Sequence, residues 1–408
     1  MALKSCFQPH PWLHRFAVLT AFCTLALLGV GGLVTSKGVG MAVPDWPTTY
    51  GYNMFFFPIS KWTGGIFYEH SHRLVASLVG TLTAILTAWI WVKEASGWSR
   101  NAALAGIVGT LGLMGVRTQT MFVVLASLAV LVLFYSLWRA ANDPRPLRWW
   151  AMVAFTAVLV QGVLGGLRVT QYKDELGIFH GTLAQLFFAL ICSLAVCTSR
   201  WWISTSAAPT DAPASATPAP GKKLSRAFLI TTILILLQLI LGATMRHQHA
   251  GLAIPDFPLA YGKLWPATDS EAIASYNARR METKGENPIT AGQVVLQMAH
   301  RFLALTIVVH GAAVAVRARR ERPPQRPLVR LATTWMLLLF VQAGLGAWTV
   351  WSNKAADIAT LHVLVGALSL VTGVVGCLIC FRRTARVNEA QGALLTEASR
   401  THAPSATN

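Results

Sequence analysis

The sequence predicts an all-α integral membrane protein, and two properties of its composition give the first reasons. Of its 408 residues, 54% are hydrophobic and only 12% are charged, and the mean hydropathy is +0.50. Globular domains in water usually carry about 25% charged residues. Because so little of the surface can be charged, most of it must face lipid.

Apolar stretches long enough to cross a bilayer recur along the chain. A helix needs about 20 apolar residues to span a hydrocarbon core of about 30 Å. Nine such stretches are predicted, near residues 15–35, 72–92, 121–139, 149–169, 178–200, 226–246, 294–316, 328–350 and 358–381. A tenth, 101–117, is shorter and rich in glycine. The sequence therefore predicts eight to ten transmembrane helices.

The basic residues favour ten helices with both termini in the cytoplasm. With ten spans, the arginines of Arg317–Arg330 and of 382–386 fall on the inner side, as the positive-inside rule requires. The net charge of +18 is then an orientation signal, and no nucleic acid is expected as a partner. No transit segment rich in Arg and Ser precedes the first helix, which predicts a bacterial inner membrane.

An internal repeat organises the chain. Residues 40–51 read GMAVPDWPTTYG and residues 251–262 read GLAIPDFPLAYG, with seven of twelve positions identical. Each copy follows an apolar helix and leads to a helix that carries a His-Arg pair. The sequence predicts two tandem four-helix bundles related by a pseudo-twofold axis along the membrane normal, with an additional hairpin near 101–139 in the first half.

The predicted boundaries follow from this repeat and from composition. The N-terminal bundle covers 15–203 and the C-terminal bundle covers 225–386. Residues 204–224, rich in Pro, Ala, Ser and Thr, are expected to form a disordered linker. The polar tail, 387–408, is also expected to be disordered.

Four histidines lie at the outer ends of predicted helices, one pair in each half: His72, His180, His300 and His362. Polar side chains at membrane depth are costly and are usually functional. Histidines from two facing helices are suitable axial ligands for heme iron. One such histidine could simply be hydrogen-bonded at the interface, but four at repeat-related positions favour heme near the outer face. Zinc is a weaker alternative, because its sites usually add Cys or carboxylate ligands.

One carboxylate distinguishes the halves. Glu69 lies three residues before His72, on one helix face, and its counterpart in the second half is Gln297. Glu69 could handle protons or stabilise positive charge at a reacting centre, or it could simply favour the helix N-terminus. Arg73 and Arg301 follow the histidines, where they could bind heme propionates bidentately or anchor the interface.

These motifs resemble the heme A synthase family. The resemblance rests on the ExxHR motif at Glu69–Arg73, its counterpart His300–Arg301 and the Pro-Asp-Trp-Pro loop, and it covers roughly 15–200 and 226–382. It implies an oxidoreductase that acts on a CH group, oxidising the C8 methyl of heme O to a formyl group by successive hydroxylations.

The resemblance also implies roles for the site residues. His72 and His180 would ligate the substrate or product heme, heme O or heme A, with Glu69 aiding catalysis. His300 and His362 would hold heme b. Implied partners are heme O, membrane lipid, an unidentified electron acceptor, and possible contacts with a heme O synthase and oxidase assembly factors.

The sequence departs from the family pattern in two places. Its first outer loop lacks the cysteine pair of some members, and the hairpin near 101–139 exceeds the usual eight helices. A non-catalytic diheme electron carrier similar to cytochrome b is the alternative. It explains the four histidines but not the Glu69 and Gln297 difference. A transporter would instead need polar residues near the bilayer midplane.

Overall fold

The computed structural model describes residues 10–116, 118–143, 145–207, 220–284, 287–321 and 325–401. Within these ranges the chain forms α-helices and short 3-10 helices, with isolated β-bridges but no strand. The first half contains α1 Pro11–Ser36, α2 Gly64–Glu94, α3 Gly97–Leu113, α4 Gln119–Asn142, α5 Leu147–Gln171, α6 Asp174–Cys197 and α7 Arg200–Ala207. The second half contains α8 Lys222–His247, α9 Ser270–Lys284, α10 Ala291–Arg320, α11 Arg326–Trp351 and α12 Ala356–Thr401. The 3-10 turns are η1 Met54–Phe56, η2 Ile59–Lys61, η3 Met114–Val116 and η4 Ala250–Leu252.

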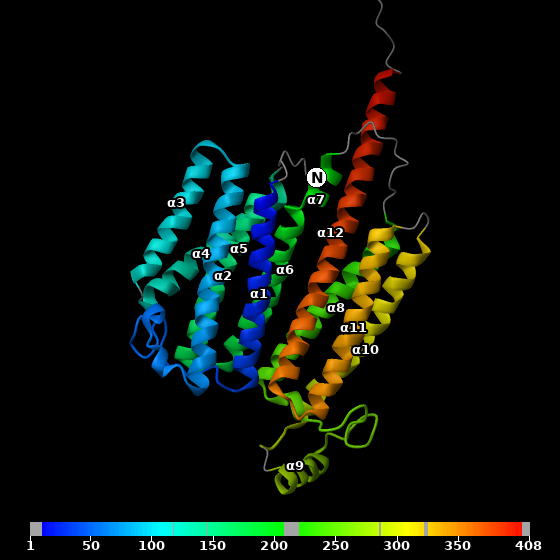
Figure 1. Ribbon diagram of the computed structural model, residues 1–408. Helices are drawn as coiled ribbons and strands as arrows, with labels where there is room; N and C mark the ends of the chain where they lie inside the picture. The colour runs from blue at the N-terminus through cyan, green and yellow to red at the C-terminus, as the bar shows by residue number, and fades with distance from the viewer. Residues whose placement is uncertain are drawn as a thin grey trace, which may run out of the picture.

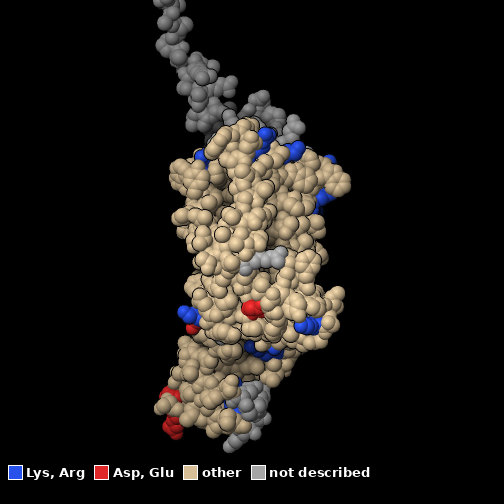
Figure 2. All heavy atoms as spheres, turned by 90° about the vertical axis from the view of Figure 1, so that its left-hand side faces the viewer, with Lys and Arg blue, Asp and Glu red and all other residues tan. Residues whose placement is uncertain are grey.

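The predicted all-α membrane architecture is confirmed. Among the described residues, nine helices are long and apolar enough to cross a membrane, namely α1, α2, α4, α5, α6, α8, α10, α11 and α12. Figure 2 shows a broad band of described surface without Lys, Arg, Asp or Glu between charged ends. The exposed large side chains of α4, among them Leu131 and Phe134, are apolar, as a surface in contact with lipid requires.

The tenth predicted span corresponds to α3. With 17 residues it rises about 25 Å, somewhat less than the hydrocarbon core, and it runs beside α2 (Figure 1). The start of α1 and the far end of α12 lie at one end of the molecule, whereas α9 and the loops before α2 and α10 lie at the other end (Figure 1). An even number of crossings produces this arrangement.

Each half has its own apolar core. In the first half, Leu13, Ile90 and Ile191 belong to one buried cluster, and in the second half Phe228 stacks on Trp335 with ring centroids 5.5 Å apart. The halves meet through α1 against α12 and α6 against α8. The bundle boundaries and the pseudo-twofold relation between the halves stay predictions.

Two boundaries differ from the sequence prediction. Helix α7 includes residues 204–207 and α8 begins at Lys222, so the linker is shorter at both ends, and residues 208–219 lie outside the described part of the chain. Helix α12 continues to Thr401, through most of the predicted disordered tail. Residues 387–401 are polar but contain Ala, Leu, Glu and Gln, which are strong helix formers. Residues 402–408 lie outside the described residues.

A charged network attaches the additional hairpin to the first half. The buried carboxylate of Asp143, between α4 and α5, accepts hydrogen bonds from Arg139 and Arg148 (2.7 Å each) and from the Trp149 indole (2.9 Å). The backbone N–H of Arg148 donates to Glu94 at the end of α2 (3.0 Å). Burial alone would raise the pKa of the Asp143 carboxyl, but the hydrogen bonds from Arg148 and its neighbours hold this pKa well below its ordinary value.

We expect Asp143→Asn to loosen this attachment. Since hydrogen bonds to charged groups contribute about 1.5–3 kcal/mol each, the variant should lower the free energy of unfolding by about that amount at pH 7. The native contribution should persist above the ordinary Asp pKa of about 3.9 and disappear only as pH falls through the lower folded pKa. Thermal unfolding in detergent measures the change. The control is Ser127→Ala on the exposed side of α4, and equal melting temperatures for both variants would contradict the prediction.

Candidate functional site

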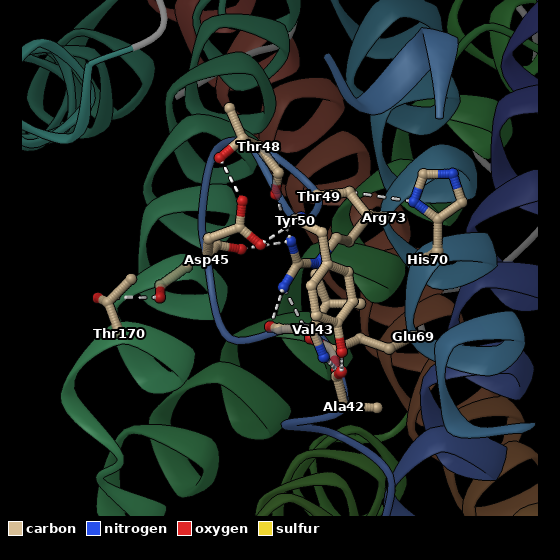
Figure 3. A network of polar contacts seen from close by, with 11 residues as sticks. Ala42, Val43, Asp45, Thr48, Thr49, Tyr50, Glu69, His70, Arg73 and Thr170 are labelled. Atoms are coloured by element: carbon tan, nitrogen blue, oxygen red, sulfur yellow. Dashed lines mark hydrogen bonds and ion pairs between the residues drawn. The ribbon is translucent and has the colours of Figure 1, made fainter. Parts of the chain in front are cut away.

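Glu69 and Arg73 fix the first outer loop to the start of α2 (Figure 3). The Glu69 carboxylate, 3% exposed, accepts a hydrogen bond from the backbone N–H of Val43 (2.8 Å) and pairs with Arg73 (2.7 Å). The Arg73 guanidinium also donates to the backbone carbonyls of Val43 (2.9 Å), Asp45 (2.7 Å) and Thr48 (2.9 Å). One ion pair therefore positions the whole Pro-Asp-Trp-Pro segment.

Asp45 closes the turn inside this loop. Its carboxylate accepts hydrogen bonds from the Thr48 hydroxyl and from the backbone N–H groups of Tyr50 (2.7 Å) and Gly51 (2.9 Å). Tyr50 and Gly51 have φ of 48° and 75°, and the two bonds hold the chain in this left-handed region. Burial works to raise the pKa of Asp45, but the hydrogen bond from Gly51 and the others outweigh it and lower that pKa.

The second outer loop is held in the same manner. The side-chain oxygen of Gln297 accepts from the backbone N–H of Ile254 (2.6 Å), the position that matches Val43 in the repeat. Arg301 donates to the carbonyls of Asp256 (2.7 Å) and Leu259 (2.9 Å). Glu69 and Gln297 thus bind equivalent amides. They differ in charge and in their second contact, because Glu69 accepts from Arg73 whereas Gln297 donates to the carbonyls of Gly251 and Ile254.

These contacts revise the expectations for three predicted residues. Glu69 shares a helix face with His72 by spacing, but its hydrogen bonds all run to the loop and to Arg73. Arg73 and Arg301 bind loop carbonyls, which accounts for both arginines without a propionate. Propionate contact by either arginine, and a catalytic role for Glu69, stay predictions.

Each of the four predicted histidines lies against a glycine of a neighbouring helix. In the first half, a Cβ atom added to Gly31 of α1 would lie 2.9 Å from Cε1 of His72, and one added to Gly165 of α5 would lie 3.1 Å from Cε1 of His180. Contacts this short leave no room for a larger residue unless the imidazole moves.

The second half repeats this geometry. A Cβ atom on Gly242 of α8 would lie 3.4 Å from Cε1 of His300, and one on Gly346 of α11 would lie 3.2 Å from Cε1 of His362. The two imidazole centroids are 6.5 Å apart. A metal ion held at about 2.0–2.1 Å by one nitrogen of each ring needs those nitrogens about 4 Å apart. Each centroid lies behind the nitrogen that would coordinate, so a centroid separation of 6.5 Å is compatible with one metal ion between His300 and His362.

The histidine rings are incompletely paired by protein atoms. Every ring is only partly exposed, yet its Nδ1 atom is buried and has no hydrogen-bond partner among the described residues. An unsatisfied buried polar atom costs about 1–3 kcal/mol. No group of three or more His, Cys, Asp or Glu gathers around a possible metal position in the described chain. Paired imidazoles suit heme iron, because the macrocycle supplies the remaining ligands.

Glutamines of neighbouring helices support two of the four histidines. The Gln161 amide on α5 donates to the backbone carbonyl of His180 (2.7 Å), and the Gln238 amide on α8 donates to that of His300 (3.0 Å). These bonds connect α6 to α5 and α10 to α8 inside the membrane.

Two arginines near the histidines were missed by sequence reasoning. Arg246 of α8 reaches the first half, where it donates to the carbonyl of Gly32 (2.7 Å) and to the Ser36 hydroxyl. Arg168 of α5 lies against the loop, because a Cβ atom on Gly40 would be 3.0 Å from its Nη1. Both arginines lie at outer helix ends, where the positive-inside rule expects few basic residues. This position could have marked them as candidate site residues.

Comparisons with known proteins give one consistent result. A family model described as cytochrome oxidase assembly protein matches residues 121–374. The chain is 24% identical over 375 residues to a protein named heme A synthase from Geobacillus kaustophilus, covering 90% of both chains. It is 23% identical to one from Shouchella clausii (88% of this chain, 94% of the relative). A third, from Lysinibacillus sphaericus, is 24% identical (94% and 99%).

We expect Arg73→Gln to release the first loop and Arg301→Gln to release the second. Loss of a hydrogen bond to a charged group, about 1.5–3 kcal/mol, should raise amide hydrogen exchange by about tenfold or more, in 43–51 for the first variant and in 254–262 for the second. Arg330→Gln, on an exposed face of α11, is the control. If either variant raises amide hydrogen exchange in both loops, or in neither loop, the prediction that each arginine anchors its own loop is contradicted.

Proposed function

The chain belongs to the heme A synthase family of cytochrome oxidase assembly proteins, and we propose that it oxidises the C8 methyl of heme O to the formyl group of heme A. The oxidation takes two successive two-electron steps, through an alcohol and then a hydrate that loses water. The electrons pass to an acceptor that the chain itself does not identify. The observation that carries the proposal is the repeated histidine–glycine geometry, with two imidazoles in each half that lie against glycines of neighbouring helices.

In this proposal His72 and His180 ligate the substrate and product heme, and His300 and His362 ligate heme b. The unpartnered Nδ1 atoms and the 6.5 Å separation of the second pair support ligation. Heme b, when bound, supplies one-electron transfer. Arg168 and Arg246 are further candidates for propionate binding beside Arg73 and Arg301. Arg246, like Arg73 and Arg301, also donates to backbone carbonyls.

Glu69 is the proposed catalytic carboxylate of the first half. Its negative charge, absent from Gln297, would stabilise positive charge that develops as the methyl carbon is oxidised, or would accept a proton from it. The ion pair with Arg73 holds the carboxylate in one orientation at the edge of the loop. This preorganisation supports an electrostatic role, because the group does not need to rotate during the reaction.

The chain is a multi-pass bacterial membrane protein by its helices and its relatives. We propose that both termini face the cytoplasm and that both heme sites lie toward the outer face. A diheme electron carrier remains the alternative function, with the same four ligands but no reaction at Glu69.

Heme extraction and chromatography of the purified protein test the ligand assignment. From a host that makes heme O, we expect wild-type protein to contain heme b together with heme O or heme A. His72→Ala should remove heme O and heme A but keep heme b, and His300→Ala should do the reverse. His310→Ala, on the same helix as His300, should keep both. Heme b alone in the wild type would favour the diheme electron carrier. A wild-type protein without any heme would contradict heme ligation by the four histidines.

Glu69→Gln tests the chemistry separately. The amide oxygen can still accept the hydrogen bond from Val43, as Gln297 does from Ile254. The ion pair with Arg73 is lost, but Arg73 keeps its hydrogen bonds to three loop carbonyls, so both hemes should remain. General acid–base groups contribute about 10²–10⁴-fold, and heme A formation should fall by about 10²-fold or more. Glu271→Gln, an exposed carboxylate in α9, should leave the rate unchanged. A normal rate in Glu69→Gln would reduce Glu69 to a loop anchor and favour the carrier.

A further inference from the structure

The additional hairpin and the first outer loop meet at Trp46. Helix α4 packs along α5, and the Trp46 ring from the loop contacts Phe122 of α4 edge to face, with centroids 4.8 Å apart and planes at 65°. The carbonyl of the preceding residue, Asp45, accepts a hydrogen bond from Arg73. Phe122 of the hairpin therefore contacts the indole ring, and Arg73 holds the backbone next to it through the Asp45 carbonyl.

A glycine on α5 makes room for this indole. A Cβ atom on Gly166 would lie 2.2 Å from Cδ2 of Trp46, so any larger residue displaces the ring. The preceding residue, Gly165, is the one against which the His180 imidazole lies. Consecutive residues of an α-helix are about 100° apart around its axis. Trp46 and His180 therefore contact adjoining sides of a single turn of α5.

The second half lacks this arrangement although it keeps the histidine contact. Gly346 contacts His362, but the next residue is Ala347, where the first half has Gly166. Phe257, the counterpart of Trp46, instead contacts Trp351 at the end of α11, with centroids 6.0 Å apart, and it is 37% exposed. The sequence repeat contains no counterpart of the hairpin that supplies Phe122.

We propose that Trp46 is a positioning residue that forms the wall of the first-half site beside His180 and fixes the in-plane orientation of the bound substrate. This inference rests on the proposed function. Oxidation of a single methyl group requires that one edge of the tetrapyrrole faces the reacting position, since small misplacements of reacting groups are costly. A rigid aromatic ring beside an axial ligand gives the planar substrate a fixed surface with a preferred geometry.

The difference between the halves is consistent with this role. A heme that only transfers electrons has no substituent to select, so its wall can be formed by a half-exposed phenylalanine. A heme that is oxidised at one carbon must be held in one rotation about the iron–histidine axis. In this proposal the additional hairpin has a function, because it supplies Phe122, which holds Trp46 in place.

Gly166→Ala tests the proposal, with Gly106→Ala as its control. Gly106 is exposed on α3, away from the histidines, and a Cβ atom there would meet nothing within 4 Å. We expect Gly166→Ala to displace Trp46, lower heme A formation by about tenfold or more, and alter the optical spectrum and reduction potential of the first-half heme. Heme b of the second half and all properties of Gly106→Ala should stay as in the wild type. Identical behaviour of the two variants would overturn the proposal.

A double variant distinguishes positioning from simple packing. Gly166→Ala with Trp46→Phe reproduces the Ala347 and Phe257 pair of the second half, so the smaller ring can accept the methyl group. We expect the double variant to regain the melting temperature and heme content of the wild type while heme A formation stays low. Recovery of wild-type heme A formation would show that the indole only fills space, and would overturn the proposal. A wild-type protein without heme O or heme A would instead contradict the proposed function itself.

Phe122→Leu tests the contact between α4 and Trp46 and keeps α4 apolar. Like Gly166→Ala, it should lower heme A formation without loss of heme b. An unchanged rate would mean that the hairpin does not support Trp46 and would overturn that part of the proposal.

Discussion

The close approach of an imidazole ring to a glycine of the neighbouring helix is the contact on which the rest of the molecule depends. Inside a bilayer the backbone must satisfy its own hydrogen bonds, so the histidines have to be carried on helices. Small residues at helix interfaces then allow the helices to approach. The four histidine–glycine contacts set which helices are neighbours in each half, namely α1 with α2, α5 with α6, α8 with α10 and α11 with α12. A side chain larger than glycine at Gly31 or Gly165 would displace the ring, and with it any metal that the ring holds.

The loops over the outer face depend on a second shared device. A polar side chain one turn before the first histidine of each half binds the backbone amide of a matching loop residue, with oxygen–nitrogen distances of 2.8 Å for Glu69 and 2.6 Å for Gln297. Exchange of a carboxylate for an amide preserves this bond, removes the charge and adds a donor, which in Gln297 bonds the carbonyls of Gly251 and Ile254 (3.3 Å each). In the first half that charge is paired with Arg73, and two charges close together interact strongly where water is scarce. The substitution therefore gives one half an electrostatic property without altering how its loop is folded.

The sequence predicted the parts of this structure that depend on local pattern. Hydropathy located the nine long apolar helices and the short one at 97–113, and the repeat identified the two outer loops and the four histidines. It missed what depends on distant neighbours. Glycines in apolar helices are common, so nothing in the sequence showed that Gly166 accommodates Trp46 whereas Gly162 accommodates nothing. Basic residues were interpreted as topology signals, so the hydrogen bond from Arg246 to Gly32 of α1 was not predicted. The tail beyond 386 was too polar to suggest a span, yet its helix propensity extends α12.

The two halves share their histidines but differ in the groups around them. Two histidines against two glycines recur in both halves. If these histidines ligate the two hemes as proposed, the ligand set does not distinguish a heme that reacts from a heme that transfers electrons, and the surrounding groups must do so. Two such groups differ between the halves: the charge at Glu69, and the wall built from Trp46, Gly166 and Phe122. Both depend on the first outer loop, because Arg73 binds Glu69 and also the carbonyl of Asp45, which precedes Trp46. Arg73 therefore connects the two groups, and in the proposed site the position of Trp46 is coupled through this guanidinium to the orientation of the Glu69 carboxylate.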